Sequence, residues 1–284
     1  GTCSVEIWNV QVHIVSTNMS GMQLISDPGS DLSQVFHAAQ LSTPLSDAET
    51  VELDESPAAA FVRLTGLRFD QAPVTSNGHF VGWVPTAQLK TTSKVKAALR
   101  PLAQCAILSV GAPLKDLLAR LGSNGLVFLA GHQGLEAFVT PSDLDRQAAR
   151  GHFYLLLSGI EMLLSDIVNE VVPEQDVEGA IAGYRLRDWE AARSKNWDTR
   201  PVEYLDLEPL CKLFSSVASG PGWDRSHDNM LDELCQLRPS VMHATRPLLA
   251  ARSPQQLAHL ADSAAHVTRS LTEYAHRLQT AGER

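Results

Sequence analysis

The stretches Gly82-Trp-Val-Pro-Thr-Ala-Gln-Leu89 and Ala137-Phe-Val-Thr-Pro-Ser-Asp-Leu144 decide the fold, because they close two copies of one sequence pattern. In each copy a helical segment, an apolar segment and a glycine-containing turn come before the closing stretch. Pro57 aligns with Pro113, so the second copy follows the first after 56 residues. Two strand-helix-strand-strand-helix units are therefore expected to pack as a pseudo-twofold pair.

The predicted elements follow the same order in both copies. The first copy contains a helix from Pro57 to about Leu67 and strands at 72–75 and 80–84. The second copy contains a strand at 105–110, a helix from Pro113 to about Leu121, and strands at 126–129 and 135–139. Each pair of late strands is joined by a turn, Ser76-Asn-Gly78 or the segment 131–134, in which glycine permits a tight hairpin.

This layout over residues 47–147 resembles a tandem CBS-domain pair, a module in which two such repeats form a cleft for adenosine nucleotides. The resemblance implies AMP, ADP or ATP as a regulatory ligand, and it assigns nucleotide binding to Thr140 and Asp143. The free N–H groups of a helix N-terminus attract phosphate, and a carboxylate accepts hydrogen bonds from ribose hydroxyls. The same two residues are also consistent with an ordinary N-terminal cap, with Pro141 at the first helical position.

The first copy departs from the nucleotide-binding pattern. Pro85 stands at the position of the Thr, and Gln88 stands at the position of the Asp. Proline has no hydroxyl, and an amide carries no charge to complement a ribose or a phosphate. The sequence therefore predicts at most one complete nucleotide site, in the second copy.

The segment 1–46 is rich in Ser, Gly, Asp and Pro. A strand-like alternation at 5–15 and a short helix at 31–41 are the elements predicted in it. We interpret the segment as an extension that covers an edge of the following domain.

Residues 148–284 are predicted to form an all-helical domain. A long apolar helix from Gly151 to Val172 is ended by Pro173, and it is expected to lie at the centre of a bundle or of a dimer. Further helices are predicted at 176–182, 187–195, 207–218, 227–237, 240–249 and 253–279. Four or five helices joined by short loops are typical of a bundle.

The helical domain contains Leu237-Arg-Pro-Ser-Val-Met-His243, in which Arg238 and His243 bracket four residues. A bundle with this spacing resembles the HEPN domains, many of which are metal-independent ribonucleases or inactive relatives of them. The resemblance implies that His243 transfers a proton and that Arg238 stabilises the phosphate during cleavage of single-stranded RNA at a site shared by a homodimer. It also suggests that Arg246 holds a neighbouring phosphate and that Glu161 orients Arg238.

Pro239 follows the arginine directly, whereas the nuclease families often have a small polar residue there. Proline favours the first position of a new helix, so a helix break at Arg238 is expected. In an unbroken helix, five residues at about 100° each would place Arg238 and His243 roughly 140° apart. The alternative interpretation is that both residues only cap carbonyls or pair with acidic neighbours.

The composition excludes several classes of function. A net charge of -9 argues against an extended surface for duplex DNA. The apolar run from 153 to 172 is interrupted by Glu161, Asp166 and Glu170, so no membrane span is predicted. Four widely spaced cysteines and the lack of a signal-peptide pattern indicate a reduced, cytoplasmic protein. No spacing of His and Cys suggests a metal site.

The sequence therefore predicts an N-terminal extension (1–46), an α+β CBS-domain pair (47–147) and a HEPN-like all-α bundle (148–284). The leading hypothesis is an adenosine-nucleotide sensor that controls a metal-independent ribonuclease. The alternative is a non-enzymatic regulatory or scaffold dimer that binds nucleotide, a protein partner or both.

Overall fold

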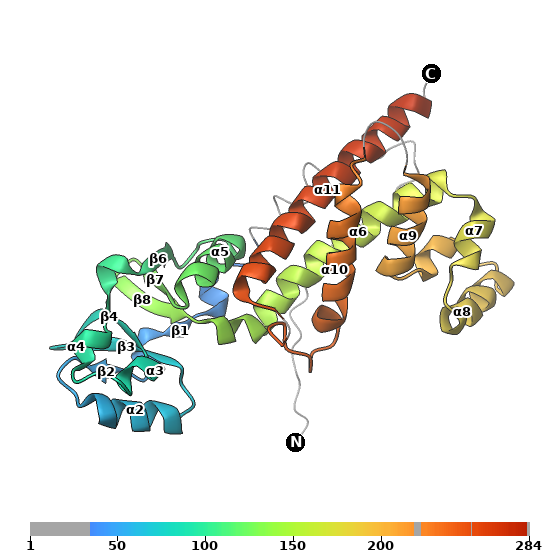
Figure 1. Ribbon diagram of the computed structural model, residues 1–284. Helices are drawn as coiled ribbons and strands as arrows, with labels where there is room; N and C mark the ends of the chain where they lie inside the picture. Colours follow the sequence, from blue (N-terminus) through green and yellow to red (C-terminus); the bar gives the residue numbers. More distant parts are fainter. Residues whose placement is uncertain (1–34, 219–222, 251, 283–284) are drawn as a thin grey trace.

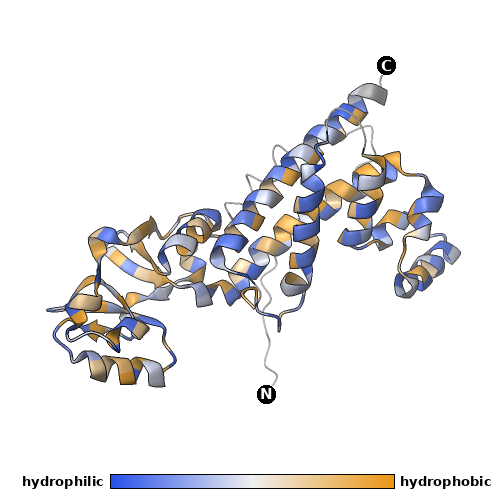
Figure 2. Cartoon of the chain, viewed as in Figure 1, coloured by the Kyte–Doolittle hydropathy of each residue, from blue (hydrophilic) through white to orange (hydrophobic). Residues whose placement is uncertain are grey.

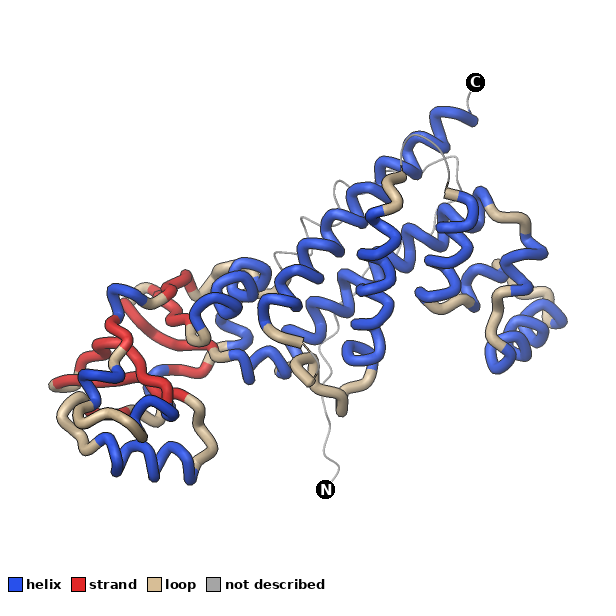
Figure 3. The backbone as a smooth tube through the Cα atoms, in the orientation of Figure 1, coloured by secondary structure: helices blue, strands red, loops and turns tan. Residues whose placement is uncertain are grey.

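The computed structural model describes residues 35–218, 223–250 and 252–282. Its strands gather at one end of the molecule and its long helices at the other (Figures 1 and 3). We call residues 35–145 the α+β half and residues 147–282 the helical half. The predicted alternation at 5–15 lies outside the described residues.

The first sheet has four strands in the order β2-β3-β4-β5. They are β2 (Val51–Glu52), β3 (Gln71–Ser76), β4 (His79–Pro85) and β5 (Arg100–Pro101). β2 and β3 are parallel, and α2 (Pro57–Gly66) connects them, whereas β4 and β5 follow antiparallel. Two short helices, α3 (Thr86–Leu89) and α4 (Val95–Ala98), lead from β4 to β5.

The second sheet has four strands in the order β1-β8-β7-β6. They are β1 (Thr43–Pro44), β8 (Gly134–Val139), β7 (Val127–Gly131) and β6 (Ala106–Ser109). β6 and β7 are parallel and are connected by α5 (Leu114–Asn124), and β8 is antiparallel to β7. The directions therefore match those of the first sheet, and both hairpins carry an irregularity at the same place, Val74/Thr75 and Leu129/Ala130.

The described part of the N-terminal extension covers a sheet edge, as expected. β1 pairs antiparallel with β8 through Thr43 and Pro44. Before it, the predicted helix at 31–41 is seen in its described part as the 3-10 helix η2 (Ala38–Leu41). A second short turn, η3 (Leu45–Asp47), and the linker turn η4 (Leu102–Gln104) complete the α+β half.

The helical half begins directly after the 3-10 turn η5 (Pro141–Asp145). Its helices are α6 (Gln147–Val171), α7 (Glu174–Gly179), α8 (Gly183–Ser194), α9 (Leu207–Val217), α10 (Ser226–Met242) and α11 (Pro254–Gly282), with the short turn η6 (Pro201–Tyr204) before α9. α6 packs against α9, α10 and α11, and α11 also packs against α5 of the α+β half (Figure 1).

The predicted break at Pro239 is wrong, because α10 continues through Pro239 to Met242. Proline removes a helical hydrogen bond and frees carbonyls in the preceding turn. Here the Arg252 guanidinium donates to the Gln236 carbonyl at 2.7 Å and reaches Ser240 Oγ at 3.3 Å. The carbonyl that loses its helical donor is that of Cys235, four residues before Pro239. Arg252 binds the next carbonyl and Ser240, so it links the turns on both sides of the proline. The helix predicted at 240–249 is also wrong, since the chain leaves the helix at His243.

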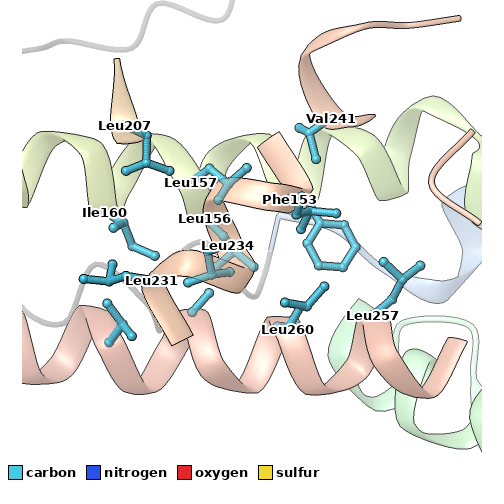
Figure 4. Packing of buried hydrophobic residues seen from close by; sticks show 14 of the residues in the cluster. Phe153, Leu156, Leu157, Ile160, Leu207, Leu231, Leu234, Val241, Leu257 and Leu260 are labelled. Atoms are coloured by element: carbon cyan, nitrogen blue, oxygen red, sulfur yellow. The ribbon is translucent and has the colours of Figure 1, made fainter. Parts of the chain in front are cut away.

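The apolar core is continuous between the second sheet and the helical half. One cluster joins Leu117 and Val127 to residues of α6, α9, α10 and α11. Figure 4 shows the part of it where Phe153 and Ile160 of α6 face leucines of α10 and α11. The first sheet has its own small cluster over residues 51–98, and Trp83, Leu126 and Phe128 form a third one between the sheets.

Figure 2 shows that most helices alternate between apolar and polar faces, whereas α6 is apolar over much of its length. By length and composition α6 is long and apolar enough to cross a membrane, contrary to the expectation that no segment is. Of its most apolar stretch of 18 residues, 39% is buried inside the protein. Phe153, Leu157, Ile160 and Leu164 supply the buried contacts.

Candidate functional site

The turn from β8 into η5 holds Thr140 and Asp143 together. The backbone N–H of Thr140 donates to Asp143 Oδ2 at 2.7 Å, and Thr140 Oγ1 donates to the same oxygen at 2.9 Å. Asp143 is only 8% exposed, so its carboxylate depends on these donors instead of water. The two residues therefore form the N-terminal cap that the sequence allowed as one interpretation.

Arg146 occupies the other side of the Asp143 carboxylate. Its Nη2 lies 2.7 Å from Asp143 Oδ1 and donates to Thr43 Oγ1 at 2.8 Å, while Nη1 donates to the Ser42 carbonyl at 2.7 Å. The Arg146 side chain is 43% exposed, so it can leave this position without opening the core. Sequence reasoning missed Arg146, although its i,i+3 spacing from Asp143 was a readable signal.

The corresponding turn of the first sheet carries a different set of contacts. Pro85 precedes α3, and Thr86 Oγ1 donates to the Phe69 carbonyl at 2.6 Å. Gln88 is exposed. At this turn the described residues offer no buried carboxylate of the kind that Asp143 provides.

A pocket of about 230 Å³ lies between the first sheet and the end of α5. The Arg100 guanidinium stands over the Trp83 ring, 5.0 Å from its centroid. Burial raises the pKa of Cys105, which also lines the pocket. Neither Thr140 nor Asp143 lines this pocket, so it is separate from the capped turn.

Arg238 is held by carboxylates of two neighbouring helical segments. Its Nη2 lies 3.1 Å from Asp206 Oδ1 and 3.6 Å from Glu161 Oε1. Arg185 reaches the same Asp206 oxygen at 2.9 Å. Burial raises the pKa of Glu161, and the positive charge of Arg238 acts in the opposite direction. Sequence reasoning singled out Glu161 as the neighbour of Arg238 but missed Asp206, which comes one residue before α9.

His243 is the C-terminal cap residue of α10, directly after Met242. Its side chain and that of Arg246 are exposed. Because α10 is unbroken from Arg238 to Met242, the two members of the motif leave the helix on different faces. Within one chain, the fold therefore places Arg238 among carboxylates and His243 in solvent and does not bring them together.

The carbonyl end of α10 is capped by a buried arginine from α6. Arg150, 8% exposed, donates through Nη1 to the carbonyls of Ser240 and, at 3.1 Å, His243. Its Nη2 donates to the Arg246 carbonyl at 2.9 Å. A cation is favourable at a helix C-terminus, where the free carbonyls concentrate negative charge. Arg150 thus fixes the backbone that carries His243 and Arg246.

Asp145 makes a second connection from η5 to the same segment. Its Oδ1 accepts the backbone N–H of Leu248 at 2.6 Å and that of Leu249 at 3.4 Å. The short run 143–150 therefore holds the capped turn at one end and the segment 240–249 at the other. We call residues 143–150 the junction.

The described residues contain no group of three or more His, Cys, Asp or Glu side chains placed to hold a metal ion.

No protein-family model matches the sequence, and no curated protein matches it. Several solved structures are similar to part of the chain. A hemolysin-like protein containing a CBS domain from Oenococcus oeni PSU aligns with 12% identity over 41% of this chain and 92% of that one, with a TM-score of 0.36. CBSX2 in complex with AMP aligns with 19% identity over 40% and 96%, with a TM-score of 0.35.

The CBS domain of a bacterial CNNM/CorC family Mg²⁺ transporter in complex with ATP aligns with 16% identity over 41% of this chain and 89% of that one, with a TM-score of 0.36. These similarities are distant and extend over about two-fifths of the chain.

Proposed function

We propose that this protein is a nucleotide-responsive regulatory protein in which the turn at Thr140–Asp143 binds an adenosine nucleotide. The observation that carries the proposal is the buried Asp143 carboxylate, which faces the two donors of Thr140 on one side and a removable arginine on the other, at a strand-to-helix turn. Ribose hydroxyls can replace Arg146 as donors to Asp143 Oδ1. The released guanidinium then pairs with phosphate, for which its donor fork is suited.

The junction supplies a route from this turn to the helical half. When Arg146 moves, η5 loses the ion pair between Arg146 and Asp143. Asp145, which accepts a hydrogen bond from Leu248, lies between Asp143 and Arg146 in the sequence. Arg150 follows one helical turn further along α6. The position of the segment 240–249 is therefore coupled to occupancy of the turn. A change there is the proposed output, read by another protein or by the chain's own chemistry in the cytoplasm.

Calorimetric titration with AMP, ADP and ATP tests the binding step. We expect one site per chain, and we expect Asp143→Asn to weaken binding by at least tenfold, because the amide removes the charge and one acceptor. Thr140→Val is a second variant that keeps the carboxylate. The matched control is Gln88→Ala at the equivalent turn of the first sheet. The proposal fails if no nucleotide binds at millimolar concentration, or if Asp143→Asn binds as the natural chain does.

Metal-independent cleavage of single-stranded RNA by Arg238 and His243 is the second candidate function. The contact between Arg238 and Glu161 favours it, because a carboxylate beside the arginine can orient the guanidinium. The binding of Arg238 to two carboxylates favours the regulatory proposal instead, because the guanidinium is already satisfied. For this reason cleavage ranks second.

A labelled RNA incubated with the protein in chelator tests this chemistry. Cleavage to a 2',3'-cyclic phosphate that Arg238→Ala and His243→Ala each reduce by at least 10²-fold supports it. His259→Ala, an exposed histidine on α11, is the control. Equal RNA integrity with and without protein, at every nucleotide tested, excludes it.

We further propose a homodimer formed through α6. Tyr154 is 46% exposed and Met162 is 57% exposed on this helix, so an apolar part of its surface faces outward. Light scattering with chromatography measures the mass. A dimer that Met162→Glu converts to a monomer supports the proposal, and a natural chain that is monomeric at tens of micromolar contradicts it.

A further inference from the structure

Two thiols from neighbouring helices meet in the helical half. Cys211 of α9 and Cys235 of α10 have their Sγ atoms 3.5 Å apart. The bond length of a disulfide is about 2.05 Å, so an approach of about 1.5 Å would join them. The two residues are 24 positions apart in the chain, and the helices that carry them are packed against each other.

The two sulfur atoms differ in accessibility and in charge environment. Cys211 is 5% exposed, whereas Cys235 is half-buried. The hydrogen bond between the thiols and burial raise the pKa of Cys211. The same hydrogen bond, assisted by the charge of Arg238, lowers the pKa of Cys235. Cys235 is therefore the thiol suited to react first with a reagent from solvent, with Cys211 donating a hydrogen bond to it.

We propose that Cys211 and Cys235 form a redox-active pair that a low-molecular-weight disulfide, such as oxidised glutathione, converts into an intramolecular disulfide. The Cys235 thiolate attacks one sulfur of the oxidant, whose S–S bond breaks and whose released thiolate takes up the proton that Cys235 lost. Cys211 then gives up its proton and attacks the Cys235 sulfur, and the second small thiol leaves with that proton. Two protein thiols are oxidised, and one small disulfide is reduced to two thiols.

The bond would fix the position of α9 relative to α10 next to the Arg238 cluster. Arg238 lies one turn after Cys235 on α10, and Asp206 immediately precedes the helix that carries Cys211. The ion pair between Arg238 and Asp206 spans the same two helical segments as the thiols. Oxidation therefore acts on the carboxylate contacts of Arg238, independently of any ligand at Asp143.

The test uses the whole 284-residue chain with Cys3→Ser and Cys105→Ser, so that Cys211 and Cys235 are its two remaining cysteines. It is equilibrated over a series of oxidised to reduced glutathione ratios, and free thiols are counted with a maleimide reagent while intact mass is recorded. We expect the count to fall from two to zero with a mass loss of about 2 Da. We also expect the melting temperature to rise by about 5 °C or more, reversibly on reduction, because a cross-link restricts the unfolded chain.

Adding Cys211→Ser provides the matched control, because Cys235 should then stop at a mixed disulfide with glutathione. In the natural chain, peptide mapping after oxidation should recover the Cys211 and Cys235 peptides joined, which keeps the test valid if a serine variant folds poorly. Retention of two free thiols in the folded pair variant would overturn the proposal. So would a stop at the mixed disulfide with both cysteines present, or a bond that forms only between two molecules.

Discussion

Replacement of Arg150 by alanine tests whether one buried side chain holds the junction to the end of α10. The guanidinium makes well-formed bonds to the carbonyls of His243 and Arg246, besides its contact with Ser240. A hydrogen bond to a charged group contributes about 1.5–3 kcal/mol. Two such bonds contribute about 3–6 kcal/mol to the free energy of unfolding. In the variant, water can bond the carbonyls of the exposed segment 243–246 and offset part of this, so we expect the free energy of unfolding to fall by about 3 kcal/mol.

Urea unfolding followed by tryptophan fluorescence measures this loss, and amide hydrogen exchange locates it. We expect faster exchange at the amides of His243 and Arg246, whose N–H groups bond to Pro239 and His243 carbonyls, and a smaller change in the first sheet. Arg150→Lys should lose about half as much, because an ammonium cannot span carbonyls on both sides. Arg193→Ala, whose side chain is 67% exposed in a surface ion pair, is the control and should cost less than about 1 kcal/mol.

A loss below about 1 kcal/mol for Arg150→Ala, with unchanged exchange at residues 243 and 246, would refute this account of the junction.

Three further perturbations test other parts of the fold. Burial lowers the pKa of His152 to about 4. The folded chain keeps this imidazole neutral, whereas in the unfolded chain it takes up a proton near pH 6.5. The free energy of unfolding should therefore fall by about 3 kcal/mol as the pH drops from about 6.5 to 4. When urea midpoints are measured against pH, His152→Leu should flatten that part of the profile. Gly82 has a φ of +153°, and an added Cβ would overlap the Arg100 carbonyl oxygen. Gly82→Ala should therefore cost about 2–4 kcal/mol in thermal unfolding, whereas Gly66→Ala, at an open helical position, should gain up to about 1 kcal/mol. The fully buried Phe214 contacts Trp223 and Tyr274 edge to face. Phe214→Ala should therefore lower the free energy of unfolding by about 3–5 kcal/mol, whereas the exposed Met162→Ala should lower it by about 0.5 kcal/mol or less in a monomer. Similar losses for both variants would contradict the assigned core.

Most elements of the α+β half could be predicted because their signals are local. Alternating apolar residues, glycine turns and a proline before each helix fix strands and helices within a few residues. The predicted strand at 135–139 became β8, Gly134–Val139, and the helix after Pro113 became α5. β1 was not predicted, because two residues carry no periodicity and pair only by virtue of an existing edge.

The error at Pro239 has a tertiary cause. Local preference puts a helix break before proline, and the sequence alone shows no compensation. In the folded chain Arg252, a residue beyond the end of α10, links the Gln236 carbonyl before the proline to Ser240 after it. The helix propensities of the residues around Pro239 do not reveal a contact from Arg252, which lies in the loop that follows α10.

The candidate site was predictable in its members but not in its contacts. Thr140 and Asp143 were identified from the resemblance of 137–144 to the CBS strand-to-helix turn, while the role of Arg146 depends on where residues 42–43 lie. Arg238 was identified from its spacing to His243 in the sequence. Its partner in the structure, Asp206, is 32 residues away in the sequence. Long-range pairs of this kind follow from helix packing, which a single sequence does not specify.

The packing of α5 against α11 affects how the protein is made. The apolar residues Leu117 and Leu121 of α5 belong to the same cluster as Leu257 and Leu260 of α11, and Gln255 bonds to the Gly122 carbonyl. α11 leaves the ribosome about 130 residues after α5. At about 5–20 residues per second, α5 waits roughly 7–26 s for this partner during synthesis. Over that interval the first sheet, with its own cluster, can complete its core, while the second sheet presents an uncovered apolar face to chaperones.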